Sequence, residues 1–416
     1  MHLSHAVSAA ALALLLAAAP GPAGAQAALS RLTLEDAVAL AARANPVLRA
    51  KRFEFQAVGA NEITAGLRPN PTATYLAEQF GGGSAALVQH TFSIGQPIEL
   101  GGKRQRRLES ARAATRVSGH ELEDVRRQVV FQVKKAFTDA LVARQELGLV
   151  EENVRSLDDL ERIQRFRAER GDISELELLR IEVQRFALER DAADARQALR
   201  IARIALRATT DPTQVPEDFE VVGALADRDV APAAVDLYRR ALDRRPDLRA
   251  AEAARAKARA DVGLARANAW WDVTPQVEYQ RIGPDNTIGF GISVPIKIFD
   301  RNQGEIARTR AETQRVDAAR EAMAVLILAE VDGALASLRT ERQKLDLLRD
   351  VYLPKARRAR DTVEFAYRRG GVSLLDYLDA QRTYRDTTTE FVRSLGSYWT
   401  AYYQLEAAVG GSLGEN

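Results

Sequence analysis

The chain of 416 residues contains no cysteine and only four histidines. Without thiols it can form no disulfide, thiol nucleophile or thiolate metal site, and N-terminal lipoprotein processing is excluded. Past the first few residues only His90 and His120 remain, and their surroundings match neither a catalytic triad nor a metal-ligand spacing. Dinucleotide-binding and P-loop glycine patterns are also missing. We therefore expect no catalytic residue, no cofactor and no metal site.

A strong charge of one sign and long apolar runs are missing too. The chain has 59 Lys and Arg against 57 Asp and Glu, a balance that disfavours a nucleic-acid partner. The single apolar run of note, 9–19, precedes an Ala-Gly-Ala cleavage pattern that ends at Ala25. It is too short to span a membrane as an anchor. We expect residues 1–25 to be a signal peptide, although its start has no Lys or Arg, and the mature chain to have no transmembrane helix.

Three landmarks recur in the same order along the chain. They are NPVLRA (45–50) with RPDLRA (245–250), QPIELGGKR (96–104) with VPIKIFDRN (294–302), and ERGDISELELL (169–179) with RRGGVSLLDYL (368–378). Recurrence at nearly one offset predicts two homologous halves. We expect repeats at 26–208 and 234–410, a proline-rich connection at 209–233, and a tail at 411–416.

Both halves follow one plan of a helix, a strand hairpin and two very long helices. The expected ranges are helices 34–67 and 235–268, strands about 71–80, 86–98, 274–282 and 287–298, and long helices about 102–169, 172–208, 302–369 and 372–410. In TIGFGISVPI, apolar residues alternate with small or polar ones, which is typical of a strand. Leucines and valines spaced by three and four predict coiled-coil packing of the long helices, with a kink at Pro354.

The four strands limit what the protein can be. Four strands cannot close a barrel, and an open sheet with an apolar face leaves two bare edges. Apolar runs of about ten residues suit tilted transmembrane strands, which must close into a barrel in lipid. Three chains would supply twelve strands and leave a lumen. Trp270 and Trp271, just before the third strand, would then belong to a membrane-interface girdle, with ordinary core packing as the alternative.

The signal peptide, the duplicated plan, QPIELGGKR and GGVSLLDYLDAQRTY resemble the TolC family of outer-membrane efflux factors over about 31–410. The resemblance implies a mainly α-helical fold with a small β part. It implies a homotrimer, in which a twelve-stranded barrel in the Gram-negative outer membrane continues into a long periplasmic helical tunnel. The implied partners are outer-membrane lipid, a periplasmic membrane-fusion adaptor and an inner-membrane RND-type transporter. IELGGKR resembles the branch that serves heavy-metal cation pumps. The alternatives are a periplasmic coiled-coil adaptor or scaffold and, more remotely, a secreted enzyme.

The same resemblance assigns a periplasmic gate. Asp376 and Asp379 match the family's pair of aspartates at the tunnel constriction, and Tyr367 matches an aromatic residue of its closing network. Three copies would place six carboxylates around the axis, favouring cations and raising some of their pKa values. The alternative is a solvated helix face, or acids that complement the helix dipole. The first half departs from this pattern, with Glu175 and Glu177 after its turn.

The two glycine turns are the implied docking tips for the adaptor. They are Gly171, Asp172, Ile173 and Ser174 in the first half, and Gly370, Gly371, Val372 and Ser373 in the second. Glycine permits the tight backbone that such a turn needs. Each serine could also cap the helix that follows.

Overall fold

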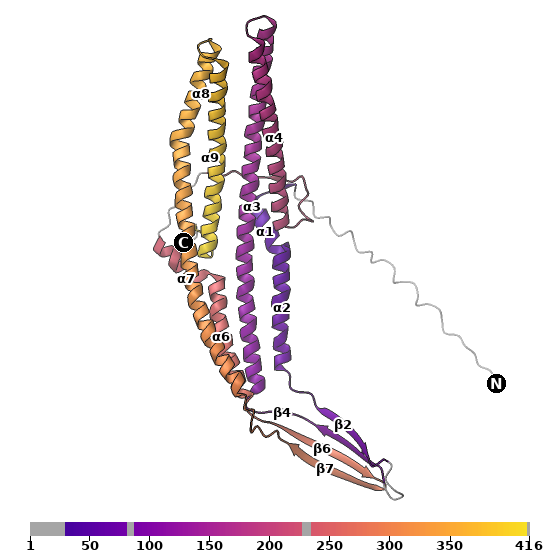
Figure 1. Ribbon diagram of the computed structural model, residues 1–416. Coiled ribbons are helices and arrows are strands. Elements are labelled where there is room, and N and C mark those ends of the chain that lie inside the picture. The colour runs from indigo at the N-terminus through magenta and orange to yellow at the C-terminus, as the bar shows by residue number, and fades with distance from the viewer. Residues whose placement is uncertain (1–29, 81–86, 227–233, 414–416) are drawn as a thin grey trace, which may run out of the picture.

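In the computed structural model, which describes residues 30–80, 87–226 and 234–413, the chain is elongated. Two long helical hairpins form one end and a β-sheet forms the other (Figure 1). The expected signal peptide lies outside the described residues. Among the helices in these ranges, none combines the length and apolar character needed to cross a membrane.

Each half contributes a pair of short helices and a long hairpin. In the first half these are α1 (Leu34–Ala44), α2 (Pro46–Gly66), α3 (Lys103–Glu169) and α4 (Glu175–Thr209). In the second half they are α5 (Ala234–Arg244), α6 (Pro246–Ala267), α7 (Gln303–Leu347), the π-helical turn η1 (Leu348–Tyr352), α8 (Leu353–Arg368) and α9 (Leu374–Val409). The 67 residues of α3 extend about 100 Å at 1.5 Å per residue.

The expectation of one continuous helix at 34–67 and at 235–268 was wrong. Each is two helices, separated at Asn45 and at Arg245, the residues before Pro46 and Pro246. Proline disfavours helical backbone at the preceding residue, and both residues have extended ψ angles, 126° and 124°. Proline itself fits the first turn of the next helix, because its missing N–H would have no partner there.

The same two residues fasten the far end of each long hairpin. The Asn45 side chain donates a 2.8 Å hydrogen bond to the carbonyl of Thr209, the last residue of α4. Arg245 Nη1 donates a 3.3 Å hydrogen bond to the carbonyl of Ala408, near the end of α9. Helix ends leave carbonyls without intrahelical donors, so both contacts satisfy groups that would otherwise lack a partner. This shared task gives a structural role to the repeated NP and RP landmarks.

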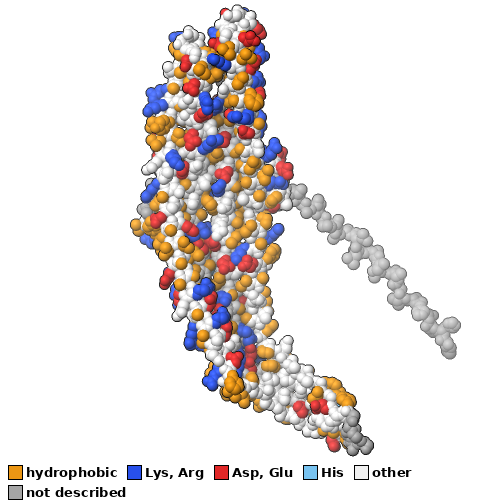
Figure 2. Space-filling model, in the orientation of Figure 1, with side chains coloured by type: hydrophobic (Ala, Val, Ile, Leu, Met, Phe, Trp, Pro, Cys, Tyr) orange, Lys and Arg blue, Asp and Glu red, His pale blue; other side chains and the backbone are white. Residues whose placement is uncertain are grey.

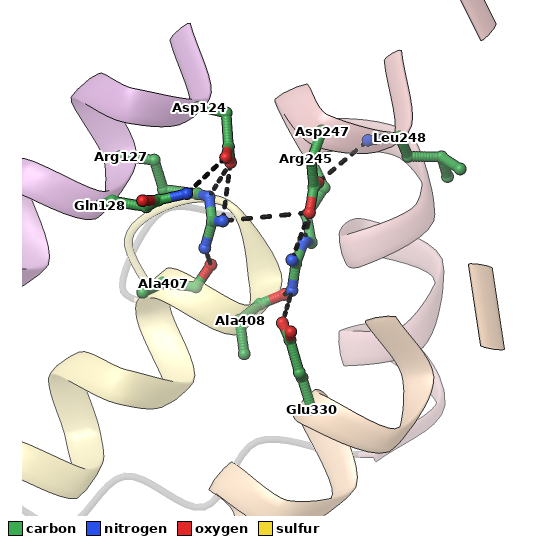
Figure 3. A network of polar contacts seen from close by, with 9 residues as sticks. All are labelled: Asp124, Arg127, Gln128, Arg245, Asp247, Leu248, Glu330, Ala407 and Ala408. Atoms are coloured by element: carbon green, nitrogen blue, oxygen red, sulfur yellow. Dashed lines mark hydrogen bonds and ion pairs between the residues drawn. The ribbon is translucent and has the colours of Figure 1, made fainter. Parts of the chain in front are cut away.

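In the second half this fastening grows into a partly buried ionic network (Figure 3). Arg245, whose side chain is 3% exposed, forms a bidentate pair with Asp247 at 3.0 and 2.5 Å and also contacts Glu330 of α7. Asp247 lies 4.0 Å from Arg127 of α3. Arg127 in turn donates to the Ala407 carbonyl at 2.8 Å, so four helices meet at the end of α9.

Separate apolar cores hold the two halves. In the first, α1, α3 and α4 bury residues around Val133, Phe137 and Leu206. In the second, α5, α6, α7 and α9 bury residues around Leu335 and Leu405. The predicted apolar seams of the long helices are buried only in part: Val133 and Leu335 are buried, whereas Val130 and Leu348 are half-buried.

A two-stranded parallel sheet beside the first core was not expected from the sequence. It joins β1 (Arg31–Leu32) to β5 (Glu220–Val221), which lies inside the proline-rich connection. Leu32 and Val221 are almost fully buried. These strands are too short to carry a visible alternation of apolar and polar residues.

Regular α-helical hydrogen bonding is interrupted near Pro354. The π-helical turn η1 ends just before it, and the N–H of Leu353 donates to the carbonyl of Leu348, one residue further back than in an α-helix. Because proline has no N–H, it cannot continue the α-helical pattern. The disturbance lies where the sequence predicted a kink.

The main sheet is antiparallel and runs in the order β2, β3, β6, β7. Its strands are β2 (Thr72–Glu78), β3 (Gln89–Gly95), β6 (Asp272–Ile282) and β7 (Asp285–Ser293), and the short β4 (Ile98–Glu99) follows β3 and pairs with the start of β6. β7 therefore ends before the expected limit of 298. Within the part of the chain that the structure describes, β2 and β7 each pair on one side only.

The two faces of this sheet differ in chemistry. Row by row, the register brings together Tyr75, Phe92, Tyr279 and Ile288, and then Ala73, Ile94, Val277 and Phe290. The larger side chains of these rows are exposed, Phe290 at 84%. The opposite face carries Thr74, Ser93, Glu278 and Gly289 in its middle row. Figure 2 shows many charged side chains over the helical part and few over the sheet.

Candidate functional site: the helical tips and the sheet

The two hairpin tips have the same backbone geometry. Gly171 and Gly370 adopt left-handed φ angles of 78° and 77°. At the first tip, Gly171 N–H donates to Ala168 and Asp172 N–H donates to Arg167. At the second tip, the corresponding bonds run from Gly370 N–H to Tyr367 and from Gly371 N–H to Ala366. The pattern is a Schellman motif, which satisfies the last carbonyls of a helix and requires a left-handed residue.

Both serines that follow the turns are N-caps. The Ser174 hydroxyl accepts from Glu177 N–H at 3.4 Å. The Ser373 hydroxyl accepts from Asp376 N–H at 3.2 Å, and the Asp376 carboxylate accepts back from the backbone N–H of Ser373 at 3.1 Å. The second arrangement is a capping box. Asp376 thus has a structural task within its own helix.

The two candidate gate carboxylates are both exposed in the single chain. They lie three residues apart on α9, so they share one side of that helix. Hydrogen bonds from the Ser373 hydroxyl and backbone N–H lower the pKa of Asp376. This direction is opposite to the rise expected from crowding in a ring, because in one chain local capping is the dominant influence.

Tyr367 is bound to the other hairpin. Gln164 of α3 donates a 2.7 Å hydrogen bond from Nε2 to the Tyr367 hydroxyl, and the Tyr367 ring stacks on Tyr377 with centroids 4.9 Å apart. Burial, with a contribution from Glu177, raises the pKa of Tyr367. Within the described chain, Tyr367 therefore interacts with Gln164 and Tyr377 rather than with the two aspartates.

An apolar cluster surrounds this contact and joins the hairpins near their tips. Leu157, Ile181 and Leu188 of the first hairpin pack with Leu374 and Tyr377 of the second. Neither the first three residues nor Gln164 could be singled out from the sequence. No local pattern marks contacts between residues about 200 positions apart, so only the fold brings them together.

Each tip also presents an arginine stacked on an exposed phenylalanine. The Arg170 guanidinium lies 4.0 Å from the Phe166 ring centroid, and that of Arg369 lies 3.9 Å from the Phe365 centroid. Both phenylalanines are more than half exposed. These residues were not predicted from the sequence, although they occupy matching positions in the two halves and alignment of the landmarks could have found them.

At the other end of the molecule, IELGGKR joins the sheet to α3. Lys103, which is buried, pairs with Asp272 at the start of β6 at 2.7 Å, and Arg107 pairs with Glu99 of β4. Gly101 has a φ of 69°, and a Cβ there would lie 2.7 Å from Trp270. The motif therefore acts as a structural joint.

Trp270 and Trp271 lie at this joint, where they are 60% and 55% exposed. Such exposure disagrees with the alternative that both rings are packed in a core. Elsewhere in the described ranges, no group of three or more His, Asp or Glu side chains is placed to hold a metal ion.

Comparison with known proteins places this architecture. Residues 26–210 and 237–411 match the model of the family "Outer membrane efflux protein". The chain is 27% identical to the cobalt-zinc-cadmium resistance protein CzcC of Cupriavidus metallidurans, covering 91% of this chain and 90% of CzcC. It is 26% identical to the nickel-cobalt-cadmium resistance protein NccC of Alcaligenes xylosoxydans xylosoxydans, covering 74% and 69%.

The fold also matches solved structures. A membrane protein from Pseudomonas aeruginosa superposes with a TM-score of 0.77 at 21% identity, covering 91% of this chain and 92% of that one. The family match falls in both halves of the duplication, on either side of the proline-rich connection. The protein is therefore a member of the outer membrane efflux protein family, a passive transport channel of the Gram-negative outer membrane and not an enzyme.

Proposed function

We propose that three copies of this chain form one duct, closed as a twelve-stranded barrel in the membrane and as a helical tunnel in the periplasm. The observation that carries this proposal is the four-stranded sheet with one exposed apolar face and one-sided pairing at β2 and β7. In lipid each unpaired backbone group would cost several kcal/mol. Pairing β7 of one chain with β2 of the next gives an antiparallel ladder at every junction.

A surface of α4 supports association between chains. It presents two groups of apolar side chains on one side of the helix: Leu176, Leu179, Val183 and Phe186, spaced by three and four residues, and Ile201 with Ile204, which begin fifteen residues further along. Each is at least half exposed in the single chain. The spacing of the first group is that of a coiled-coil seam. A helix of a neighbouring chain would cover it and continue the wall of the tunnel.

The rival function, a periplasmic coiled-coil adaptor, gives no role to the exposed apolar face of the sheet. As a duct, the chain instead receives substrate through its hairpin tips from an adaptor and an inner-membrane RND-type transporter. The equivalent Schellman turns offer two similar docking sites per chain. The exposed Phe166 and Phe365 add apolar contact area beside them.

Asp376 and Asp379 serve as an acidic constriction in this duct. Three chains bring six carboxylates towards one axis, where they attract cations and repel anions. The contact from Gln164 to Tyr367 ties the two hairpins of a chain together and helps to hold the tunnel closed. The same closed state keeps the two aspartates close to the axis.

The cargo is heavy-metal cations, in line with the resistance proteins CzcC and NccC, to which the chain is similar. The chain needs no tight metal site for this task, because a duct only has to let the ion pass. Substrate choice then belongs to the pump, and the acidic constriction is compatible with a cationic cargo.

The test uses a Gram-negative host that keeps a cobalt-zinc-cadmium pump and adaptor but lacks its own duct. The wild-type chain should restore tolerance to cobalt, zinc and cadmium ions. Phe92→Arg places a charge on the lipid face in each chain, at a cost of about 2–4 kcal/mol near mid-membrane, and should abolish tolerance. Ser93→Arg, one residue along the same strand, faces the lumen and should preserve it. Equal effects of the two variants would argue against a lipid-facing sheet.

A further inference from the structure

Two basic side chains lie at the end of the sheet that is farthest from the helices. His90 of β3 and Arg281 of β6 are directly paired across the sheet, on the apolar face. They come one row beyond Tyr75 and Phe92, which are exposed. A pair of basic residues thus borders the apolar surface at its distal edge.

Acidic side chains are excluded from this face in the described strands. The register places every acidic residue in the strands of this sheet on the opposite face, namely Glu78, Glu99, Asp272, Glu278 and Asp285. The neighbour of Arg281 on β7 is Asn286, which is uncharged. Among the described strand residues of this sheet, the positive charge of Arg281 therefore has no counter-charge on its own face.

Hydrogen bonds within the sheet orient both side chains. Arg281 Nε donates to the Gly283 carbonyl at 3.2 Å, which leaves the two terminal nitrogens directed away from that bond. His90 Nδ1 lies 2.9 Å from the Tyr75 hydroxyl, and the two rings are stacked. With the Tyr75 hydroxyl donating to Nδ1, His90 carries its hydrogen on Nε2. Both side chains can thus donate to an external anion.

The height of this rim fits the thickness of a membrane. About 33 Å of strand separates Trp271 from Arg281 at roughly 3.3 Å per residue, and a tilt of about 40° reduces this to about 25 Å. That is the height of the apolar band of an outer-membrane barrel. The tryptophans thus mark one interface and the basic pair marks the other.

We propose that Arg281 and His90 bind the phosphate of a phosphorylated glycolipid in the outer leaflet, whose acyl chains lie along the apolar rows below. The inference rests on the proposed insertion of the sheet as a closed barrel. The terminal nitrogens of Arg281 form the planar fork that binds phosphate oxygens in a bidentate manner. His90 Nε2 donates a third hydrogen bond, and the aromatic rows supply the contact surface for the lipid chains.

The experiment uses the purified full-length trimer and three probes. They are diphosphoryl lipid A, the same lipid with its phosphates removed, and inorganic phosphate. Native mass spectrometry counts the lipid molecules that each trimer retains over a concentration series. Arg281→Gln and His90→Gln test the site. Arg301→Gln is the matched control, since Arg301 is also exposed and its Nε donates to a local carbonyl, that of Ile298, at 3.3 Å.

The wild-type trimer should retain the diphosphoryl lipid about tenfold more tightly than the dephosphorylated one, as expected for charged hydrogen bonds. Arg281→Gln should remove most of that preference, His90→Gln part of it, and Arg301→Gln none. Equal retention of both lipids, or an unchanged preference in Arg281→Gln, would overturn the proposal. Inorganic phosphate binding as tightly as the lipid would overturn it too, by identifying a site for free anions. Trimer formation and conductance, measured on the same samples, report separately on the duct itself.

Discussion

Replacing Arg245 by methionine probes the network at the end of α9 directly. Methionine keeps a long, flexible apolar side chain and removes the guanidinium. The change leaves Asp247, whose side chain is only 15% exposed, with Leu248 N–H at 3.0 Å and the more distant Arg127 at 4.0 Å. It also removes the Arg245 donor from the carbonyl of Ala408.

The structure sets the size of the effect. Removing one member of a buried ion pair typically costs about 3–5 kcal/mol, because the remaining charge stays buried. Because Asp247 retains some contacts, the loss of stability in Arg245→Met should lie near the lower end of this range, at about 3 kcal/mol. The contact to Glu330 adds little, because that side chain is 56% exposed. Arg245→Met combined with Asp247→Val should regain most of the loss, since the first half carries Val47 at the matching position.

The pH dependence of the free energy of unfolding provides an independent test. Burial tends to raise the pKa of Asp247, but the hydrogen bonds and charge of Arg245 outweigh it and lower that pKa. In the wild type this stabilisation is present above the unfolded value of about 3.9 and is lost as the pH falls through the lower folded value. In Arg245→Met the effect of burial on the Asp247 carboxylate is no longer offset by Arg245, so the pKa of Asp247 rises. Protonation of Asp247 then removes the cost of a buried, unpaired charge. The stability gap between the two proteins should therefore be larger at pH 7 than at pH 4.

Urea unfolding of the detergent-solubilised trimer, followed by circular dichroism at both pH values, measures these differences. A double-mutant cycle with Asp247→Val measures the interaction free energy between Arg245 and Asp247. A stability of Arg245→Met equal to that of the wild type at pH 7 would contradict a stabilising role for the ion pair. A loss of stability in the double variant equal to the sum of the losses in the two single variants would contradict it as well.

Two further predictions concern the tips. Gly171→Val and Gly370→Val should abolish metal tolerance while trimers remain in the membrane, because a β-branched residue is strained at a positive φ. Unchanged tolerance would count against docking at these turns. Gly148→Val, inside α3, is the control. Asp376→Asn with Asp379→Asn should reduce both the cation preference of the closed trimer in planar bilayers and its block by polyvalent cations, and acid should weaken the wild-type block by protonating the ring. Ser373→Ala is the control: it removes a cap but keeps both charges, so the cation preference and the block should remain. A double Asn variant that keeps its full cation preference and its full block would identify the aspartates as an ordinary helix face.

Local sequence patterns were enough to predict the duplication, the long helices and the alternating strands. The helix break at Arg245 was missed, although the dipeptides Asn-Pro and Arg-Pro carry a local signal for it. Proline is well tolerated in the first turn of a helix, so apolar spacing on both sides reads as one helix unless the residue before it is weighed.

Other features depend on contacts that no local pattern encodes. The bond from Gln164 to Tyr367 joins the two hairpins, and β1 pairs with β5 over a similarly long separation. Capping by Ser373 was expected, but the reciprocal hydrogen bond that the Asp376 carboxylate accepts from the Ser373 N–H was not, although a serine followed three residues later by an acid is a known signature of it. The gate residue therefore has a structural role as well as its proposed electrostatic one.

Closure of the sheet by neighbouring chains is the central claim, and the absence of native cysteine makes it testable by cross-linking. Thr74→Cys on β2 is combined in turn with Gly289→Cys, Gly291→Cys or Ser293→Cys on β7, all on the lumen face. Within one chain β3 and β6 separate these strands by about 14 Å, beyond the roughly 7 Å that a disulfide can bridge. At least one pair should give covalent trimers in oxidised membranes, and either cysteine alone should give none. Failure of every pair to link chains, in variants that reach the membrane at normal levels, would contradict a barrel shared by three chains.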